Sequence, residues 1–214
     1  MTDLFADQSS RRFNEPLEPG AVLLRGFLDD EAALLEEVDR IAAASPFRYL
    51  ITPGGYQMSV GMTNCGPVGW VSDKSGYRYD PIDPASGRPW PAMPQRFLDL
   101  ARRAAREAGF AEYAPDACLI NRYVPGAKLG LHVDRDEDDP VAPIVSVSMG
   151  LPATFLWGGK RRADPVRRLR LESGDVAVWG GPARFVYHGV SPLKDGRHPL
   201  TGASRINLTF RKVF

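Results

Sequence analysis

From residue 117 onward the chain is a succession of short apolar runs separated by turn residues. Glycine and proline pairs, such as those within 125–126, 158–159 and 180–182, separate several of these runs. Short strands at regular spacing with turn signals between them are typical of an antiparallel sandwich or barrel. We therefore predict a jelly-roll-like core with strands at 117–124, 144–149, 153–158, 167–172, 175–180, 184–189 and 205–212.

Two segments ahead of this half have the spacing of amphipathic helices. The first follows Asp29 and Asp30, which suit an N-cap, and ends before Pro46. The second opens at Pro94 and stops at Gly109. The apolar faces are predicted to hold Leu34, Leu35, Val38, Ile41 and Ala42 in the first helix, and Phe97, Leu98, Ala101, Ala105 and Ala108 in the second.

Residues 52–93, between the two helices, are rich in glycine, proline, aspartate and serine. Large aromatic side chains interrupt them, so the segment is too aromatic to be disordered and too broken for long elements. We predict short strands and loops that form a lid. Helices and lid followed by many strands give an α+β fold class. The aromatic residues of the segment are Tyr56, Trp70, Tyr77, Tyr79 and Trp90.

A length of 214 residues suits one integrated domain. We divide it into residues 1–92, an N-terminal extension with the lid, and residues 93–214, a helix with the strand-rich core. A hydrophobic fraction of 43% with 25% charged residues is ordinary for a globular protein that buries a real core. Monomer is the default expectation for such a chain.

No run of 18 apolar residues occurs, and the first residues lack a basic segment followed by an apolar one. We therefore expect a cytoplasmic protein that contacts no membrane. In that compartment Cys65 and Cys118 are expected to be free, buried thiols. The tryptophans Trp90, Trp157 and Trp179 are assigned to the core.

The charge is unevenly distributed although the net charge is only +1. Residues 160–170 hold six basic residues and one acid, whereas residues 134–139 hold five acids and one arginine. The basic run is compatible with a solvated loop and with contact to nucleic acid, and the composition does not separate the two.

The sequence contains a candidate metal site. His132 and Asp134 form a His-x-Asp pair whose side chains share a face in an extended segment, with Val133 pointing away into packing. His188 lies 54 residues after Asp134. Two imidazoles and one carboxylate suit iron(II) with open positions, while zinc or simple hydrogen-bonded histidines remain as alternatives. The third histidine, His198, is assigned to a loop.

A candidate anion site lies near the C-terminus. Strict alternation over residues 205–211 places Arg205, Asn207, Thr209 and Arg211 on one face of a strand and apolar residues on the other. Two arginines on a half-buried strand need anionic partners, and a dicarboxylate supplies two. Asn121 and Tyr123 on another strand can donate to the same carboxylates. An exposed strand with solvated arginines is the alternative.

The order of these motifs resembles the AlkB family of iron(II)- and 2-oxoglutarate-dependent dioxygenases. The resemblance extends over nearly the whole chain and includes residues 4–7, 52–56, 62–66, 115–123, 143–148 and 207–211. It implies a double-stranded β-helix (jelly-roll) core with an N-terminal helical and lid extension. It also implies iron bound by His132, Asp134 and His188, and 2-oxoglutarate held by Asn121, Tyr123, Arg205, Asn207 and Arg211, with Arg205 at the distal carboxylate.

The same resemblance implies oxidative demethylation of N-alkylated bases such as 1-methyladenine and 3-methylcytosine in DNA, single strands being favoured, and in RNA. Dioxygen and 2-oxoglutarate would be consumed, with release of succinate and formaldehyde. Trp70, Tyr77 and Asp136 are expected to bind the base. Backbone contacts are expected from Thr52, Tyr56, Ser59, Lys128 and Arg162, with Met58 as part of an apolar wall.

Two other functions use the same residues. One is an oxygenase of this fold that acts on a protein or a small molecule. The other is a non-catalytic nucleic-acid-binding module. The aromatic lid argues against the first and the complete ligand set against the second. Val133 is a departure, since the best-known bacterial relative has a polar residue there that can touch substrate.

Overall fold

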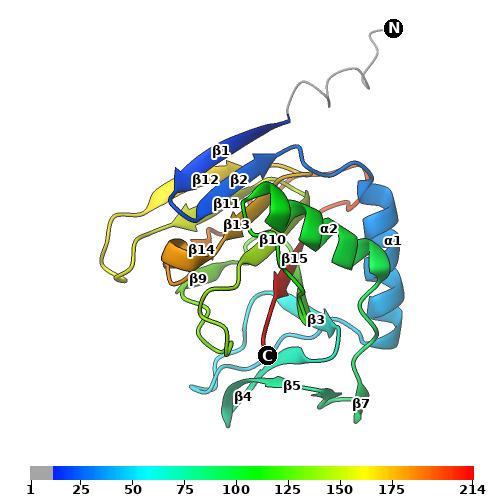
Figure 1. Cartoon of the computed structure of the whole chain (residues 1–214). Helices are drawn as coiled ribbons and strands as arrows, with labels where there is room; N and C mark the ends of the chain where they lie inside the picture. The colour runs from blue at the N-terminus through cyan, green and yellow to red at the C-terminus, as the bar shows by residue number, and fades with distance from the viewer. Residues whose placement is uncertain (1–11) are drawn as a thin grey trace, which may run out of the picture.

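The computed structural model describes residues 12–214, so the motif at residues 4–7 lies outside the described residues. Its largest element is a seven-stranded antiparallel sheet (Figure 1). In spatial order the strands are β1 (Phe13–Glu18), β2 (Ala21–Arg25), β13 (Val176–Trp179), β10 (Ile144–Gly150), β15 (Arg205–Arg211), β8 (Ala117–Tyr123) and β3 (Gly61–Cys65).

A four-stranded antiparallel sheet faces the larger one and completes the core. Its order is β12 (Arg167–Leu171), β11 (Ala153–Trp157), β14 (His188–Val190) and β9 (Leu129–His132). Two packed sheets of short antiparallel strands confirm the predicted jelly-roll core. The predicted lid contains two hairpins, β4 (Gly69–Asp73) with β5 (Gly76–Asp80) and β6 (Ile82–Asp83) with β7 (Arg88–Pro89).

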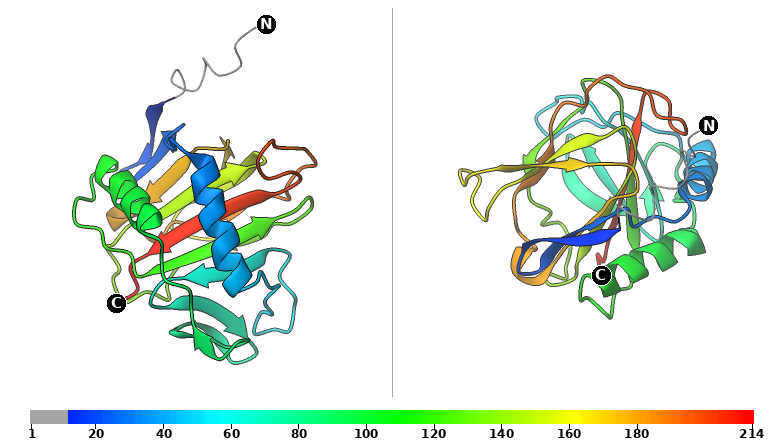
Figure 2. Two further views of the ribbon diagram at one scale, coloured as in Figure 1. Left: turned by 90° about the vertical axis from the view of Figure 1, so that its right-hand side faces the viewer. Right: turned by 90° about the horizontal axis from the view of Figure 1, so that it is seen from above.

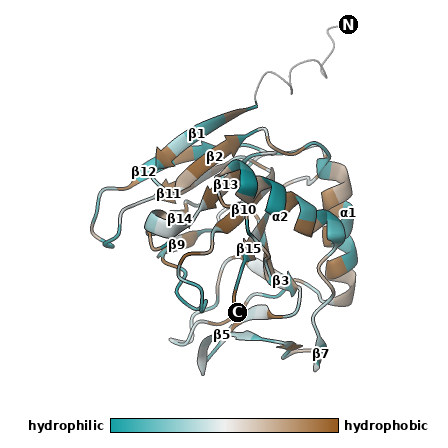
Figure 3. Ribbon diagram, viewed as in Figure 1, coloured by the Kyte–Doolittle hydropathy of each residue, from teal (hydrophilic) through white to brown (hydrophobic). Residues whose placement is uncertain are grey.

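The seven-stranded sheet buries apolar side chains on both faces. Along β15, Ile206, Leu208 and Phe210 pack on the helix side. On the side that faces the smaller sheet, Leu119 and Tyr123 of β8 join a second apolar cluster. In Figure 3 the strands β2 and β10 are mostly hydrophobic, whereas the helices carry both kinds of residue. Period-two alternation thus directs one face of β15 to the helices and its polar face between the sheets.

Two helices cover the outer face of the larger sheet, as the left view in Figure 2 shows. In α1 (Glu31–Ala44) the Asp30 carboxylate accepts a hydrogen bond from the Ala33 amide, which confirms the predicted cap. In α2 (Gln95–Glu107) the buried residues differ in part from the prediction, because Leu98 is only half-buried. Leu100 and Ala104 are buried beside Phe97, Ala101 and Ala105.

Three strands come from a part of the chain where only helices and a lid were predicted. β1 and β2 precede α1 and extend the large sheet, and β3 pairs with β8 at its other edge. In that pairing Cys65 lies opposite Cys118, and both are buried free thiols. The four-residue strand β9 was also not predicted. These strands are short, and their pairing partners lie far away in the sequence.

The predicted strand at 184–189 is wrong for most of its length. Residues 181–183 form a 3-10 turn, η2 (Gly181–Ala183), and β14 begins only at His188. The physical reason lies in Arg184, which is 2% exposed and donates hydrogen bonds to the Asp134 carbonyl and the Glu137 carboxylate. Because a buried guanidinium must be hydrogen-bonded, these contacts hold the backbone at Arg184 in a conformation that does not pair as a strand.

No helix in residues 12–214 is long and apolar enough to cross a membrane.

A buried carboxylate fixes the base of the lid. Asp83 in β6 is 3% exposed and accepts hydrogen bonds from Arg48, Ser45, Ser86 and the Ala85 amide. Burial alone would raise the pKa of Asp83, but the bonds from Arg48, Ala85 and Ser86 together hold it below its ordinary value. The lid is thereby tied to the C-terminal end of α1, where Ser45 is the cap residue.

Asp83→Asn should lower the free energy of unfolding by about 2 kcal/mol at pH 7, because charge-assisted hydrogen bonds are lost. The folded-state pKa of Asp83 is depressed. The carboxylate therefore stabilises the fold above its unfolded pKa of about 3.9, and this effect disappears as pH falls through the folded pKa. Urea unfolding should show the gap between the two proteins narrowing below about pH 5. Asp138→Asn, at an exposed residue, serves as the control, and a gap independent of pH would contradict the assignment.

Candidate active site

A cavity of about 610 Å³ lies between the two sheets. Its walls come from β8, β9, β10, β11, β13, β14 and β15, and from the β4–β5 hairpin of the lid. A volume in this range is typical of small-molecule sites. Every residue predicted to bind metal or 2-oxoglutarate lines this one cavity: Asn121, Tyr123, His132, Asp134, His188, Arg205, Asn207 and Arg211.

The three candidate metal ligands converge at one end of the smaller sheet. His132 ends β9 and lies directly opposite His188 at the start of β14. The Asp134 carboxylate is 3.6 Å from His132 Nε2 and 3.9 Å from His188 Nε2. One ligand atom from each residue lies within 4.8 Å of the others. Since metal–ligand bonds of these types are about 2.0–2.2 Å, one ion can bridge such atoms after a small adjustment.

Hydrogen bonds orient both imidazoles with one nitrogen free. His132 Nδ1 lies 2.9 Å from the Gly130 carbonyl oxygen, and His188 Nδ1 lies 3.0 Å from the Val186 carbonyl oxygen. A carbonyl oxygen only accepts, so each Nδ1 carries the proton and donates it. Each Nε2 then keeps a lone pair that faces Asp134. This is the tautomer that a metal-binding histidine needs.

The surroundings set the charge states that metal binding requires. Burial and then the neighbouring His132 lower the pKa of His188 to about 3, so its ring is neutral at pH 7. Burial would raise the pKa of Asp134, but Arg211, His188 and His132 outweigh it and hold that pKa well below its usual range. A neutral imidazole and an ionised carboxylate are the ligand forms of these side chains.

The two arginines of β15 are buried and have hydrogen-bonding atoms to spare. Arg205 is 1% exposed, and its Nη2 donates to Ser148 Oγ at 2.9 Å. Arg211 donates from Nε and Nη2 to Asp134 Oδ2 at 3.1 and 2.9 Å. Within residues 12–214, Arg205 Nε and Nη1 and Arg211 Nη1 find no acceptor. Burial lowers the pKa of Arg205, as expected for a guanidinium without an anion beside it.

The neighbouring strand completes this anion site. In the β8–β15 register Tyr123 lies opposite Arg205 and Asn121 opposite Asn207. The Tyr123 ring centroid is 5.0 Å from the Arg205 guanidinium carbon. Unsatisfied buried donors are rare in proteins, so several of them on residues that line one cavity indicate an anion-binding site. A dicarboxylate matches two guanidinium groups on one strand face.

A second buried ion network was not predicted from the sequence. The Glu137 side chain is 2% exposed and accepts a hydrogen bond from Arg184 Nη2 at 2.8 Å. Its other oxygen lies 3.3 Å from Arg211 Nε and accepts a hydrogen bond from the Tyr79 hydroxyl. The network links the lid strand β5 to the carboxylate Asp134 through Arg211. An arginine inside an otherwise apolar run, Arg184, is the sequence signal that could have revealed it.

The lid brings the predicted base-binding residues together at the cavity. The rings of Trp70 and Tyr77 are stacked, with centroids 5.5 Å apart and planes 15° apart. Trp70 Nε1 donates a hydrogen bond to Asp136 Oδ2 at 3.0 Å. Of the other predicted contacts, the cavity is lined by Thr52, Met58, Ser59, Lys128 and Arg162.

One predicted placement differs from the structure, and one is incomplete. Tyr56, predicted to contact the nucleic-acid backbone, is 79% exposed and is not among the lining residues of the cavity, so its role stays a prediction. Val133 was expected to point away into packing, but it is half-buried and lines the cavity. β9 ends at His132, so strict strand alternation no longer applies to Val133. Trp179 is core as predicted, yet it also lines the cavity, with its ring centroid 4.8 Å from that of His188.

Some further lining residues were not singled out from the sequence. Ser146 lies opposite Thr209 in the β10–β15 register and extends the polar face that carries Thr209 and Asn207. The alternation of β10 could have identified Ser146. Gln57 and Phe155 also line the cavity, together with Leu119, whose face of β8 was predicted.

Comparisons with known proteins agree with this geometry. The profile of the 2OG-Fe(II) oxygenase superfamily matches residues 20–211. The whole chain is 58% identical to the alpha-ketoglutarate-dependent dioxygenase AlkB of Escherichia coli K12, with 98% of that protein covered. It is 30% identical to the DNA N(6)-methyladenine demethylase ALKBH1C of Arabidopsis thaliana over 92% of this chain and 49% of that protein. The solved structure of OsALKBH1 is similar, with a TM-score of 0.82, 31% identity, and coverage of 93% of this chain and 99% of that one.

Asp134→Ala should weaken binding of a divalent transition metal by more than about 100-fold, because loss of an outer partner alone costs 10- to 100-fold. Titration with Co(II) followed by visible absorption measures the affinity, and the melting temperature reports metal-linked stabilisation. His198→Ala, at a histidine that does not line the cavity, is the matched control. Equal affinity in wild type and Asp134→Ala would remove this residue from the ligand set.

Arg205→Met should weaken 2-oxoglutarate binding by about 100-fold, which corresponds to about 3 kcal/mol for a lost guanidinium–carboxylate contact. Anaerobic calorimetric titration of the metal-loaded proteins gives the affinities. Arg102→Met removes an exposed arginine of α2 and should leave the affinity unchanged. If both variants bind 2-oxoglutarate like the wild type, the anion site lies elsewhere.

Proposed function

The chain belongs to the AlkB family of the 2OG-Fe(II) oxygenase superfamily, and on this premise we propose that it oxidatively removes alkyl groups from nucleic-acid bases. The observation that carries the proposal is a single cavity that joins three kinds of group. These are a His-Asp-His triad, a pair of buried arginines with free donors, and a stacked tryptophan–tyrosine pair in the lid.

We assign iron(II) to His132, Asp134 and His188, and 2-oxoglutarate to the arginine pair. The triad offers the nitrogen and oxygen donors that iron(II) accepts while leaving positions open, and the free guanidinium donors suit a dianion. When bound, these groups supply the oxidation: 2-oxoglutarate and dioxygen become succinate and carbon dioxide, and one oxygen atom enters a C–H bond of the alkyl group. The hydroxymethyl group then leaves the base nitrogen as formaldehyde.

The residues of the chain bind and orient the two organic molecules. Arg205 is assigned to the distal carboxylate of 2-oxoglutarate, with Asn121, Tyr123 and Asn207 beside it. Arg211 pairs with Asp134 and keeps that carboxylate ionised and fixed. Both arginines lie within a closed, largely apolar region, where charge-assisted hydrogen bonds are strongest.

The lid is assigned to the damaged base. Trp70 and Tyr77 offer aromatic surface for stacking, which contributes about 1–3 kcal/mol per base. Asp136 accepts a hydrogen bond from the indole N–H of Trp70, and this bond fixes the carboxylate beside the stacking surface. A carboxylate there suits the positive charge of 1-methyladenine or 3-methylcytosine. A base must leave its stack to reach the triad, so single strands are the favoured substrates, in DNA and also in RNA.

The remaining contacts divide by chemistry. Thr52, Ser59, Lys128 and Arg162 are assigned to the phosphate backbone, and Met58 to an apolar wall. Tyr56 is assigned to the nucleic acid outside the cavity, since its ring is exposed. In this division residues 1–92 supply the aromatic lid and part of the backbone contacts, and residues 93–214 supply the chemistry together with Lys128, Asp136 and Arg162, within one integrated domain.

The purified protein, loaded with iron(II) under argon and then given 2-oxoglutarate and oxygen, should remove the methyl group from an oligonucleotide that contains 1-methyladenine or 3-methylcytosine. Mass spectrometry should show loss of one methylene unit, dependent on iron, 2-oxoglutarate and oxygen. Asp134→Ala is the inactive control. Succinate formation without methyl loss on any methylated oligonucleotide would favour a protein or small-molecule substrate and contradict the proposal.

A further inference from the structure

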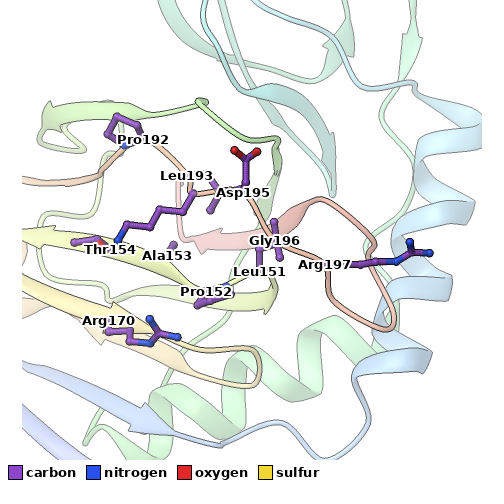
Figure 4. Close-up of a pocket in the computed structure, with 11 residues that line it drawn as sticks. Leu151, Pro152, Ala153, Thr154, Arg170, Pro192, Leu193, Asp195, Gly196 and Arg197 are labelled. Atoms are coloured by element: carbon purple, nitrogen blue, oxygen red, sulfur yellow. The ribbon is translucent and has the colours of Figure 1, made fainter.

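A second cavity, of about 370 Å³, lies on the outer face of the four-stranded sheet (Figure 4). Its floor is formed by residues 151–154, in the turn before β11 and the start of that strand, together with Arg170 of β12. Residues 192–197, which follow β14, form its other wall. None of these residues lines the inter-sheet cavity.

The strand register directs arginines toward this outer face. In β12, Leu169 and Leu171 are buried against the core, so the alternate residues Arg168 and Arg170 project outward and are exposed. Arg170 lies opposite Thr154 of β11, which also lines the outer cavity. An arginine pair on the solvated face of a sheet extends the cavity into a positively charged surface.

The segment after β14 adds two further cations. Lys194 and Arg197 are exposed, and within residues 12–214 neither has a carboxylate within ion-pair distance. Arg170 pairs with Glu172, and Asp195 is the one acidic residue among the lining residues. The cavity lining therefore holds three cations against one anion.

The backbone amides of the same segment are also available as hydrogen-bond donors. Among the residues described, none of the amides of residues 194–197 donates a hydrogen bond to a protein acceptor. The segment packs close on the floor, since a Cβ on Gly196 would lie 3.0 Å from Leu151 Cδ2. Successive free amides beside cations form concavities that bind anions such as phosphate.

The β11–β12 hairpin contributes residues both to this surface and to the inter-sheet cavity. Arg162, in the loop that joins β11 to β12, lines the inter-sheet cavity and donates to the Leu131 carbonyl at 2.8 Å. The same hairpin, which projects from the body in the right view of Figure 2, carries Arg168 and Arg170. Along β11, Thr154 is three residues from Trp157, which pairs with His188. Three residues of extended strand span about 10 Å. That length matches about three nucleotides at 3.4 Å per step.

We propose that the outer cavity, with Arg170, Lys194 and Arg197, binds phosphate groups of the nucleic acid several nucleotides away from the base held in the inter-sheet cavity. The inference rests on the proposed function, since it takes nucleic acid as the ligand. In this proposal the nucleic acid follows the basic stretch at residues 160–170 from the mouth of the inter-sheet cavity across the outer face. Binding there is electrostatic and independent of base sequence.

The test uses the double variant Lys194→Ala/Arg197→Ala and a matched control, Arg102→Ala/Arg106→Ala, which removes two exposed arginines from α2. Substrates are a methylated trinucleotide and a methylated 20-mer with the lesion at its centre. The cavity variant should bind the 20-mer about 5- to 10-fold more weakly near 0.1 M salt. The slope of log affinity against log salt should become shallower by about 1.4, which is two contacts at about 0.7 each for single strands.

Trinucleotide turnover should be unchanged in the cavity variant, because a central lesion leaves one nucleotide on each side, which is short of the about three steps to the outer cavity. Lys194→Arg should keep the 20-mer affinity of the wild type. An unchanged salt slope, or equal losses in the cavity variant and the α2 control, overturns the proposal. Loss of trinucleotide turnover also overturns it, since it would trace the effect to the inter-sheet cavity. Absence of turnover in the wild type refutes the proposed function instead, and anisotropy binding still tests the outer cavity because it needs no reaction.

Discussion

Two guanidinium groups in the space between the sheets are the constraint on which the rest of the site depends. Arg205 and Arg211 are carried by a central strand whose other face is fully used by the apolar core, so neither can turn toward solvent. A buried cation must have partners, because an unpaired one costs several kcal/mol. Within residues 12–214, Arg211 has the carboxylates of Asp134 and Glu137 as partners, whereas Arg205 has only a serine hydroxyl and the face of a tyrosine ring.

This unequal pairing explains why the two ends of the cavity bind different groups. At one end the arginine–carboxylate pairs fix a metal-binding carboxylate in its ionised form next to the neutral imidazole of His188. At the other end a guanidinium keeps free donors for a ligand. The buried charged groups around the site are three guanidinium groups, Arg184, Arg205 and Arg211, and two carboxylates, Asp134 and Glu137. A divalent cation adds to this net positive charge and the dianion 2-oxoglutarate offsets it, so binding of the metal and of the co-substrate is electrostatically coupled.

The sequence was informative where local pattern and tertiary structure agree. The alternation in β15 predicted which residues share each face, although the strand is buried on both faces and was expected to be half-buried. The caps and spacing predicted α1, because these patterns follow from period and local hydrogen bonding. The strand predicted at 184–189 failed because Arg184 is satisfied by residues some fifty positions away. β1, β2 and β9 were missed because short strands acquire their structure from partners distant in the chain. Val133 was misplaced because the strand ends one residue before it. Local periodicity contains no information about any of these long-range contacts.

The metal and the dicarboxylate are expected to occupy the inter-sheet cavity together, held by the triad and the arginine pair. Crystals grown without oxygen in iron(II) and 2-oxoglutarate, measured at the iron absorption edge, test this arrangement most directly. We expect one anomalous peak about 2.0–2.2 Å from ligand atoms of His132, Asp134 and His188. It also predicts dicarboxylate density that reaches the free donors of Arg205. An iron peak outside the triad, or a dicarboxylate bound outside this cavity, would contradict it.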